Sequence, residues 1–119
     1  MADSAVRFGL IGYGAWGQYH AQAIAKTEGG RLVAIAEPGE ESRQTACESH
    51  PDAAVVGDYR ELVARDDLDV VDVVVPNRMH HEVAMAVLAS GKHLFLEKPM
   101  CLTMSECDDV LRQAAEKHL

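Results

Sequence analysis

The sequence predicts a doubly wound α/β fold, a parallel sheet with helices on both faces, in a single domain of 119 residues. Short apolar runs alternate with helical patterns from one end of the chain to the other, and the connections are short. A glycine-rich turn follows the first apolar run directly. This alternation is typical of parallel sheets because a helix usually makes the crossover between two parallel strands.

Five short runs rich in aliphatic and β-branched residues are expected to form the strands. Residues 70–75, VVDVVV, are the clearest case and indicate a strand buried on most of both faces. Pro76 ends this run because proline has no backbone N–H to donate. The expected strands span residues 6–11, 32–36, 54–56, 70–75 and 93–96.

Helical patterns follow each expected strand. Two of them begin with a capping box, Asp58-x-x-Glu61 and Thr103-x-x-Glu106. After Thr103, small and apolar residues recur at the spacing of one buried helix face. The expected helices span residues 15–26, 40–49, 58–64, 79–90 and the segment that follows Thr103.

The composition disfavours several classes of function. Lys and Arg total 11 and Asp and Glu total 19, so the net charge of −8 argues against binding to nucleic acid or to anionic membranes. No apolar run approaches the roughly 20 residues that span a bilayer, and residues 1–4 lack the features of an export signal. The cysteines, Cys47, Cys101 and Cys107, form no CxxC pair, which favours free thiols and a cytoplasmic location.

The strongest local motif is a complete GxGxxG that follows the first strand and opens the first helix. Gly12 permits a tight turn, Gly14 lets the backbone approach a pyrophosphate, and Gly17 allows close packing of helix on strand. The free N–H groups at the start of the helix favour phosphates. We therefore expect this loop to bind a dinucleotide through Gly12, Tyr13, Gly14, Ala15, Trp16 and Gly17.

The glycine loop is the first part of a dinucleotide-binding fingerprint, and an acidic residue stands where the second part requires one. Glu37 follows the second strand, 20 residues after Gly17, and can accept hydrogen bonds from ribose hydroxyls. It would repel a 2′-phosphate by about 4 kcal/mol for unit charges about 4 Å apart. NAD is therefore favoured, and NADP stays possible because Arg43 is near enough in sequence to reach the same place.

Glu97, Lys98 and Pro99 end the fifth strand, at the edge of the sheet where ligands of such folds bind. A lysine held there by a neighbouring carboxylate can assist an oxygen that changes charge during hydride transfer. From composition alone, a surface ion pair at the end of a strand is the simpler interpretation.

Three segments together resemble one family. Residues 12–20 match a GxGxxGxxH start, residues 76–80 a PNxxH segment, and residues 91–99 an aGKHVxxEKP segment. In this order they resemble the glucose–fructose oxidoreductase and inositol dehydrogenase (Gfo/Idh/MocA) family. The resemblance covers residues 6–119 but only the N-terminal half of the family.

The resemblance implies a Rossmann-type sheet with strand order 3-2-1-4-5 and an NAD(P)-dependent oxidoreductase acting on sugars, cyclitols or related substrates. It assigns Lys98 to catalysis beside the nicotinamide, and Glu97 to the nicotinamide ribose and to Lys98. It also places Pro76, Asn77 and His80 along the cofactor. The family holds its substrate mainly in a second domain, which residues 1–119 lack, so we expect this chain alone to be inactive.

Other interpretations remain at this stage. A non-catalytic dinucleotide sensor would use the glycine loop and Glu37 but not Lys98, and a domain for another adenosine ligand would not need residues 97–99. His80 and His81 are adjacent on a helix and point apart, so no metal site is expected. The open edge of the fifth strand and the apolar face of the last helix favour self-association or a homo-oligomer.

Overall fold

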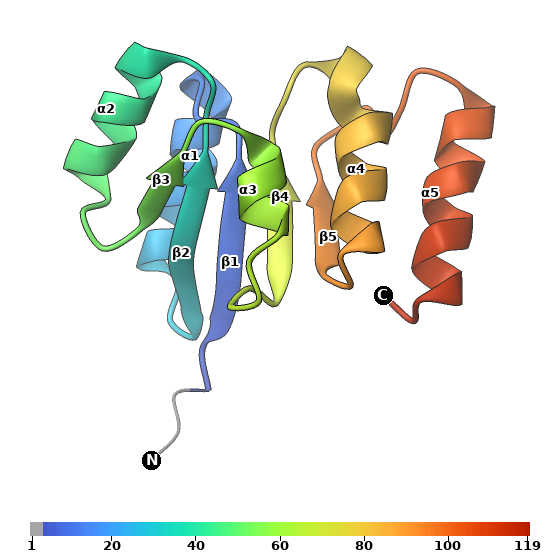
Figure 1. Ribbon diagram of the computed structural model, residues 1–119, viewed down its shortest axis with the longest axis horizontal. Coiled ribbons are helices and arrows are strands. Elements are labelled where there is room, and N and C mark those ends of the chain that lie inside the picture. The colour runs from blue at the N-terminus through green and yellow to red at the C-terminus, as the bar shows by residue number, and fades with distance from the viewer. Residues whose placement is uncertain (1–3) are drawn as a thin grey trace.

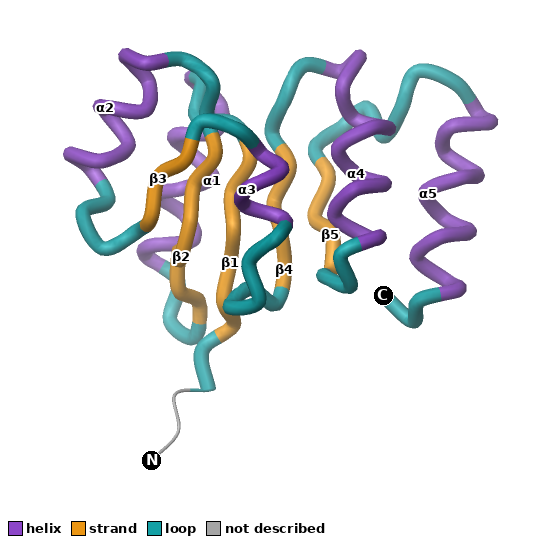
Figure 2. Tube along the Cα trace, in the orientation of Figure 1, coloured by secondary structure: helices purple, strands orange, loops and turns teal. Residues whose placement is uncertain are grey.

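A computed structural model describes residues 4–119 and confirms a parallel five-stranded sheet flanked by helices (Figure 1, Figure 2). Residues 1–3, most of the segment examined for an export signal, lie outside the described residues. The strands are β1 (Val6–Ile11), β2 (Gly30–Ala36), β3 (Ala54–Val56), β4 (Val70–Val73) and β5 (His93–Leu96). The helices are α1 (Ala15–Lys26), α2 (Glu40–Ser49), α3 (Tyr59–Val63), α4 (His80–Ala89) and α5 (Met104–Glu116), with a 3₁₀ turn, η1, at Asn77–Met79.

The strand order is β3-β2-β1-β4-β5, as predicted, and every neighbouring pair is parallel. β1 lies in the centre, where Leu10 stands opposite Ile35 of β2 and Asp72 of β4. The order reverses between β1 and β4, which is where ligands bind in open α/β sheets. The carboxyl ends of β1 and β4 therefore mark the place to search for a site.

One face of the sheet is covered by α3 and α4, with α5 packed beside α4 (Figure 1). Strand residues of this face alternate with residues of the other face, as the pleat requires. Their aliphatic side chains form one core, which comprises Ile11, Ala34, Ala36, Leu62, Leu68, Val71, Val73, Val83 and Val87.

The opposite face is covered by α1 and α2 over β1, β2 and β3 only. Ala21 and Ile24 of α1 and Ala46 of α2 pack there against Leu10 and Ile35. Among residues 4–119, α1 reaches this face of β4 at Asp72 through His20, and no helix covers the same face of β5. Phe95 of β5 is consequently 56% exposed, and Asp72 of β4 faces the side chains of α1 instead of an aliphatic layer.

Two strand bounds differ from the sequence prediction, and α3 and α4 are each one residue shorter at both ends than predicted. β4 ends at Val73 and not at residue 75: the Val74 N–H still donates to the Ile11 carbonyl oxygen at 2.8 Å, but Val74 and Val75 lie beyond the strand and line a cleft. β2 begins at Gly30, two residues earlier than predicted, because Gly30 pairs with Val6 of β1. Glycine has a low intrinsic preference for strands, so the sequence carried no signal of this extension.

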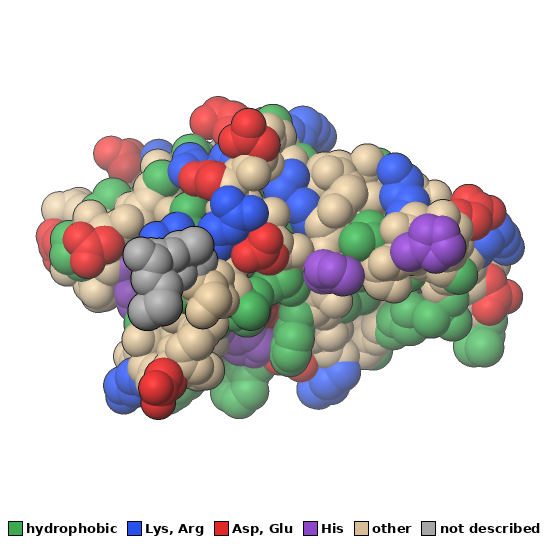
Figure 3. Space-filling model, turned by 90° about the horizontal axis from the view of Figure 1, so that it is seen from below, with side chains coloured by type: hydrophobic (Ala, Val, Ile, Leu, Met, Phe, Trp, Pro, Cys, Tyr) green, Lys and Arg blue, Asp and Glu red, His purple; other side chains and the backbone are tan. Residues whose placement is uncertain are grey.

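Acidic and basic side chains pair at the amino ends of the strands. Arg7 donates to Asp69 at 2.9 Å, and Arg65 donates to Asp67 at 2.7 Å. Hydrogen bonds from Arg7 lower the pKa of Asp69 to about 2. Asp67 and Asp69, which precede β4, are therefore paired, and Figure 3 shows acidic and basic side chains intermixed at this end. No helix among the described residues has the length and apolar character to cross a membrane.

We predict that Leu62→Ala destabilises the domain by about 2–5 kcal/mol, because a fully buried leucine leaves a cavity in the core beneath α3. Urea denaturation followed by circular dichroism measures this difference. Leu102→Ala is the matched control, since Leu102 is 62% exposed and should change the free energy of unfolding by less than about 0.5 kcal/mol. Equal losses in the two variants would contradict the described packing.

Candidate cofactor site

A cleft of about 790 Å³ opens at the carboxyl ends of the strands, over the point where the strand order reverses. Its walls come from the segments that follow β1, β2, β3, β4 and β5. Most of the predicted site residues line it, namely Gly12, Gly14, Trp16, Gly17, Glu37, Pro76, Asn77, Glu97 and Lys98. The volume lies within the usual range for a small-molecule or cofactor pocket.

Two glycines of the loop are required by close approaches of the backbone. Gly12 has a φ of +102°, and a Cβ there would lie 1.9 Å from the carbonyl oxygen of Val74. A Cβ at Gly17 would lie 2.2 Å from the carbonyl oxygen of Gly12. Gly14, in contrast, has nothing within 4 Å of its Cβ position, so its backbone borders open space in the cleft.

The start of α1 is suited to an anion. Gly14 is the N-cap and supplies no side-chain hydrogen bond, and the first turn carries no acidic residue. The first N–H groups of a helix lack intrahelical partners and carry part of the positive end of its dipole. A phosphate placed here would therefore meet hydrogen-bond donors and no negatively charged side chain in the first turn of α1.

Tyr13 and Ala15 do not line the cleft. The Tyr13 side chain is 2% exposed and packs in the core below α1 and α2, edge-on to His50 at 5.9 Å between ring centroids. Its backbone N–H, however, donates to Glu37 at 2.8 Å. Any contribution of Tyr13 to a ligand thus comes from its backbone, while Ala15 is an exposed residue at the start of α1.

Glu37 is fixed at one end of the cleft by two backbone donors. One carboxylate oxygen accepts from Tyr13 N at 2.8 Å and the other from Gly39 N at 2.7 Å. A carboxylate has about four lone-pair sites, so acceptor capacity remains for a ligand. The guanidinium of Arg43 donates to the carbonyl oxygens of Glu37 and Pro38 at 3.2 and 2.6 Å.

Glu97 is held at the other end by donors from three directions. One oxygen accepts from the indole N–H of Trp16 at 2.7 Å, and the other accepts from the backbone N–H of Lys98 at 2.9 Å. His20 Nε2 lies 2.9 Å from the same oxygen as the indole. The backbone bond from Lys98, followed by those from Trp16 and His20, lowers the pKa of Glu97, so this carboxylate is ionised. Lys98 is exposed at the cleft, and its peptide bond to Pro99 is cis.

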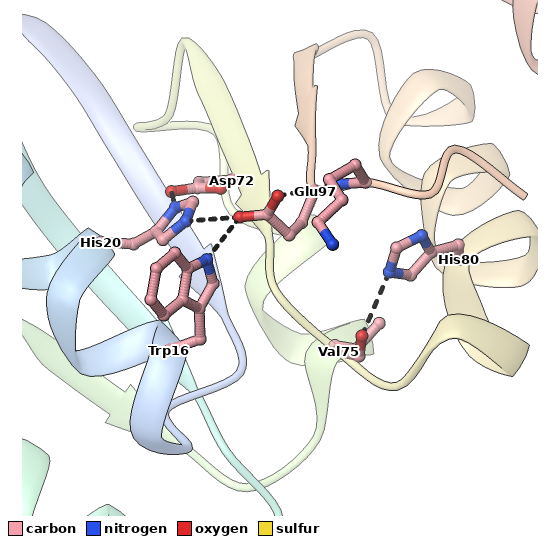
Figure 4. Close-up of polar contacts among 7 residues, drawn as sticks. Trp16, His20, Asp72, Val75, His80 and Glu97 are labelled. Carbon is pink, nitrogen blue, oxygen red and sulfur yellow. Dashed lines mark hydrogen bonds and ion pairs between the residues drawn. The ribbon is translucent and has the colours of Figure 1, made fainter.

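Asp72 joins the same network from β4, where its side chain is buried beneath His20 of α1. His20 Nδ1 lies 2.6 Å from Asp72 Oδ2, so the imidazole bridges two carboxylates (Figure 4). Burial alone would lower the pKa of His20, but the hydrogen bonds and charges of Asp72 and Glu97 outweigh it and raise the pKa. His20, the last residue of the GxGxxGxxH segment, is thus a hydrogen-bonding residue. Nothing in the sequence indicated its partner Asp72, which lies 52 positions away.

His80 lies behind the cleft and not on its wall. Its side chain is fully buried, and Nε2 lies 3.1 Å from the carbonyl oxygen of Val75 (Figure 4). Nδ1 lies 2.7 Å from the carbonyl oxygen of Pro99. This placement does not support the predicted contact between His80 and a cofactor. The ring instead ties the loop after β4 to the loop after β5, and these loops carry Asn77 and Lys98.

The segment after β3 also contributes to the cleft, although its sequence predicted only the start of a helix. Tyr59 donates to Glu82 of α4 at 2.9 Å, and the Arg60 guanidinium lies 5.0 Å from the Tyr59 ring centroid. Their position directly after β3 could have indicated that these residues line the cleft, because the carboxyl ends of parallel strands lie at the same edge of the sheet. The additional lining residues with polar side chains are Asp58, Tyr59, Arg60 and Glu82.

His81 and Cys101, two residues of types that often carry chemistry, lie outside the cleft. His81 pairs with Asp109 at 3.0 Å, away from the partners of His80, and residues 4–119 contain no group of three ligands suited to a metal ion. Burial raises the pKa of the Cys101 thiol to about 11, so the thiol is not activated as a nucleophile.

The geometry is that of a dinucleotide cleft, and sequence comparison agrees. The profile of a family described as "Oxidoreductase family, NAD-binding Rossmann fold" matches residues 6–119. The chain belongs to the Gfo/Idh/MocA family. It forms that family's NAD-binding Rossmann domain, as the resemblance of its three motifs indicated.

Individual members of the Gfo/Idh/MocA family share this domain. The inositol 2-dehydrogenase/D-chiro-inositol 3-dehydrogenase of Halalkalibacterium halodurans is 35% identical over 109 residues, which are 90% of this chain and 31% of the relative. A glycosyl hydrolase family 109 protein of Shewanella baltica is 36% identical over 118 residues, covering 92% of this chain and 26% of the relative. The crystal structure of apo scyllo-inositol dehydrogenase from Lactobacillus casei superposes with a TM-score of 0.91 at 27% identity, covering 99% of this chain and 35% of that one.

The chain therefore spans about a third or less of the length of these Gfo/Idh/MocA relatives. The shared part is the cofactor domain, and proteins named as dehydrogenases and as glycoside hydrolases both carry it.

We predict that Gly12→Ala destabilises this Gfo/Idh/MocA domain by about 2–4 kcal/mol. The substitution combines a positive φ with a Cβ that overlaps the Val74 carbonyl oxygen. Gly14→Ala should change the free energy of unfolding by less than about 1 kcal/mol, because its Cβ meets open space at a helix N-cap. Urea denaturation compares the two variants, and a loss at Gly14 as large as that at Gly12 would contradict the described loop.

Proposed function

We propose that this chain is the dinucleotide-binding domain of an NAD-preferring oxidoreductase that acts on a hydroxyl-bearing carbon of a sugar, cyclitol or related substrate. The observation that supports this most is the arrangement of one cleft with Glu37 at one end and Lys98 at the other. The glycine loop and the start of α1 lie between them. The Glu37 end thus offers acceptors for the adenosine ribose of a dinucleotide, and the Lys98 end offers a donor beside its nicotinamide.

In this proposal the pyrophosphate lies against the backbone of Gly14 and the first N–H groups of α1. The adenosine ribose hydroxyls donate to Glu37, which is already oriented by Tyr13 N and Gly39 N. A 2′-phosphate would bring a second negative charge to Glu37, while Arg43 is engaged with two backbone carbonyls. These contacts favour NAD over NADP.

At the other end, Lys98 is the proposed catalytic residue. A bound nicotinamide supplies hydride exchange with the substrate carbon. The Lys98 ammonium donates a hydrogen bond to the substrate oxygen and stabilises the charge that develops there. Glu97 orients the backbone of Lys98 directly, and Asn77 of the neighbouring loop is a polar contact for the nicotinamide.

The substrate itself is proposed to be held by parts outside this domain, since the relatives are about three times as long or longer. We expect the domain alone to bind cofactor and to have no turnover. The three unpaired thiols fit a cytoplasmic location.

We predict that the domain binds NADH at least about tenfold more tightly than NADPH, because Glu37 repels the 2′-phosphate. Trp16, the single tryptophan, lines the cleft, so its quenching and its energy transfer to the reduced nicotinamide report binding. Glu37→Gln should reduce the preference and weaken NADH binding about tenfold, through loss of charge-assisted hydrogen bonds.

One control and one further variant accompany this titration. Glu28→Gln changes the same charge at an exposed position outside the cleft and should leave both affinities unchanged. Gly14→Ala, which keeps the fold, should weaken binding because its Cβ occupies the approach of the pyrophosphate. Failure of a folded sample to bind either nucleotide would refute the proposed function.

We also predict that the domain self-associates at high concentration. β5 is an edge strand, and an apolar groove of about 460 Å³ lies between it and α5. Leu111 of this groove is 59% exposed, so Leu111→Glu should shift the sedimentation coefficient toward that of a monomer. Leu102→Glu is the control, since Leu102 is 62% exposed and lies outside the groove. Sedimentation of the unmodified domain as a monomer at every concentration would contradict this prediction.

A further inference from the structure

The bridge made by His20 connects two parts of the molecule with different surroundings. Asp72 Oδ2 lies 2.6 Å from Nδ1, and Glu97 Oε2 lies 2.9 Å from Nε2. The Asp72 side chain is 5% exposed, whereas Glu97 borders the cleft. Figure 4 shows the imidazole between the two carboxylates, with the Trp16 indole reaching Glu97 from α1.

The protonation state of this ring decides how many hydrogen bonds it can donate. An imidazolium donates from both nitrogens, and a neutral imidazole donates from only one. Both nitrogens of His20 face carboxylate oxygens, which only accept when ionised. The protonated ring therefore satisfies both partners, and the neutral ring leaves a lone pair facing one of them.

A neutral His20 ring has a single N–H, and we expect it to donate this N–H to Asp72 and not to Glu97. The other oxygen of Asp72, Oδ1, is buried without a hydrogen-bond partner among the described residues, so Asp72 has no alternative donor. A buried carboxylate that loses its partner is costly, whereas Glu97 keeps donors from Trp16 and Lys98. Deprotonation would thus turn the Nε2 lone pair toward Glu97 Oε2, and the two would repel.

We propose that His20 is a positioning residue: its protonated ring holds the Glu97 carboxylate between Trp16 and Lys98, and loss of that proton loosens Glu97 and weakens the hold on the nicotinamide end of the cofactor. The effect on the cofactor rests on the proposed function. The effect on Glu97 does not, because it follows from contacts within residues 4–119.

The surroundings of the ring support this assignment. Among the described residues, the charged groups that act on His20 are Asp72 of β4 and Glu97 after β5. Its other neighbours are aromatic, namely Trp16 on α1 at 6.4 Å and Phe95 on β5 at 6.1 Å between ring centroids. The carboxylates raise the pKa of His20 above 6.5, so the bridge contributes stability below that pH and loses it as the pH rises through the raised pKa.

The first experiment follows Trp16 emission in the cofactor-free protein from about pH 5.5 to about pH 9. Because the Trp16 indole donates to Glu97 next to His20, we expect a one-proton step with a midpoint above 6.5. His20→Gln should abolish the step, and Asp72→Asn should lower its midpoint by removing a charge. His81→Gln removes a histidine from another histidine–carboxylate pair and should leave the step unchanged.

Nuclear magnetic resonance of the His20 ring protons gives the same midpoint without relying on a variant that must fold. A step that persists in folded His20→Gln would overturn the proposal. An unmodified protein whose Trp16 emission does not change while the His20 ring titrates would do the same.

The second experiment compares NADH with ADP by calorimetry at pH values on either side of the midpoint. Both ligands contain the adenosine and pyrophosphate, and only NADH reaches Glu97 and Lys98 in the proposed orientation. We expect NADH affinity to fall roughly tenfold on deprotonation of His20, as for loss of one charge-assisted hydrogen bond, and not to fall in His20→Gln. The terminal phosphate of ADP itself titrates near about pH 6, so ADP affinity should change with pH equally in the two proteins. An NADH loss of the same size in both proteins would overturn the role at the nicotinamide end. Absence of binding by either ligand would refute the proposed function, and the emission step would still decide whether His20 holds Glu97.

Discussion

The close approach of Gly12 to the carbonyl of Val74 is the constraint on which the site depends. The two strands whose order reverses, β1 and β4, end side by side, and the chain leaves β1 through a space too small for a Cβ. Gly17 then packs on the carbonyl of Gly12, which fixes the first turn of α1 against β1. The direction of the helix start, and with it the position of its free N–H groups, follows from two contacts between backbone atoms.

Both ends of the cleft are organised from this loop. The backbone of Tyr13 orients Glu37 at one end, and the indole of Trp16 orients Glu97 at the other. The two aromatic side chains of the loop consequently serve opposite purposes: Tyr13 is buried in the core, and Trp16 is 59% exposed at the cleft. Because the same short turn determines where both carboxylates lie, it sets the separation between them.

The fold could be predicted from the sequence because its signals are local. Alternation of apolar runs with helices indicated the parallel sheet, and glycine spacing after β1 indicated the phosphate loop. The network around His20 was not predictable in this way, because its partners are 52 and 77 positions away. Asp72 in particular interrupts an apolar run, and nothing in the run tells whether it faces water or a histidine. The family resemblance of residues 76–80 placed His80 along the cofactor, but the start of α4 turns its ring inward to the carbonyl oxygens of Val75 and Pro99.

The uncovered face of β5 gives the His20 bridge an environment that can change. Phe95 and Tyr19 stand exposed there, beside the bridge, and the His20 side chain is still 17% exposed. A surface laid over these aromatic rings would exclude water and lower the local dielectric constant around the imidazolium and its two carboxylates. Their attraction would then be stronger than in the free domain. The open face of β5 and the Glu97 end of the cleft are thereby connected through a single side chain, which contacts Asp72 on one side and Glu97 on the other.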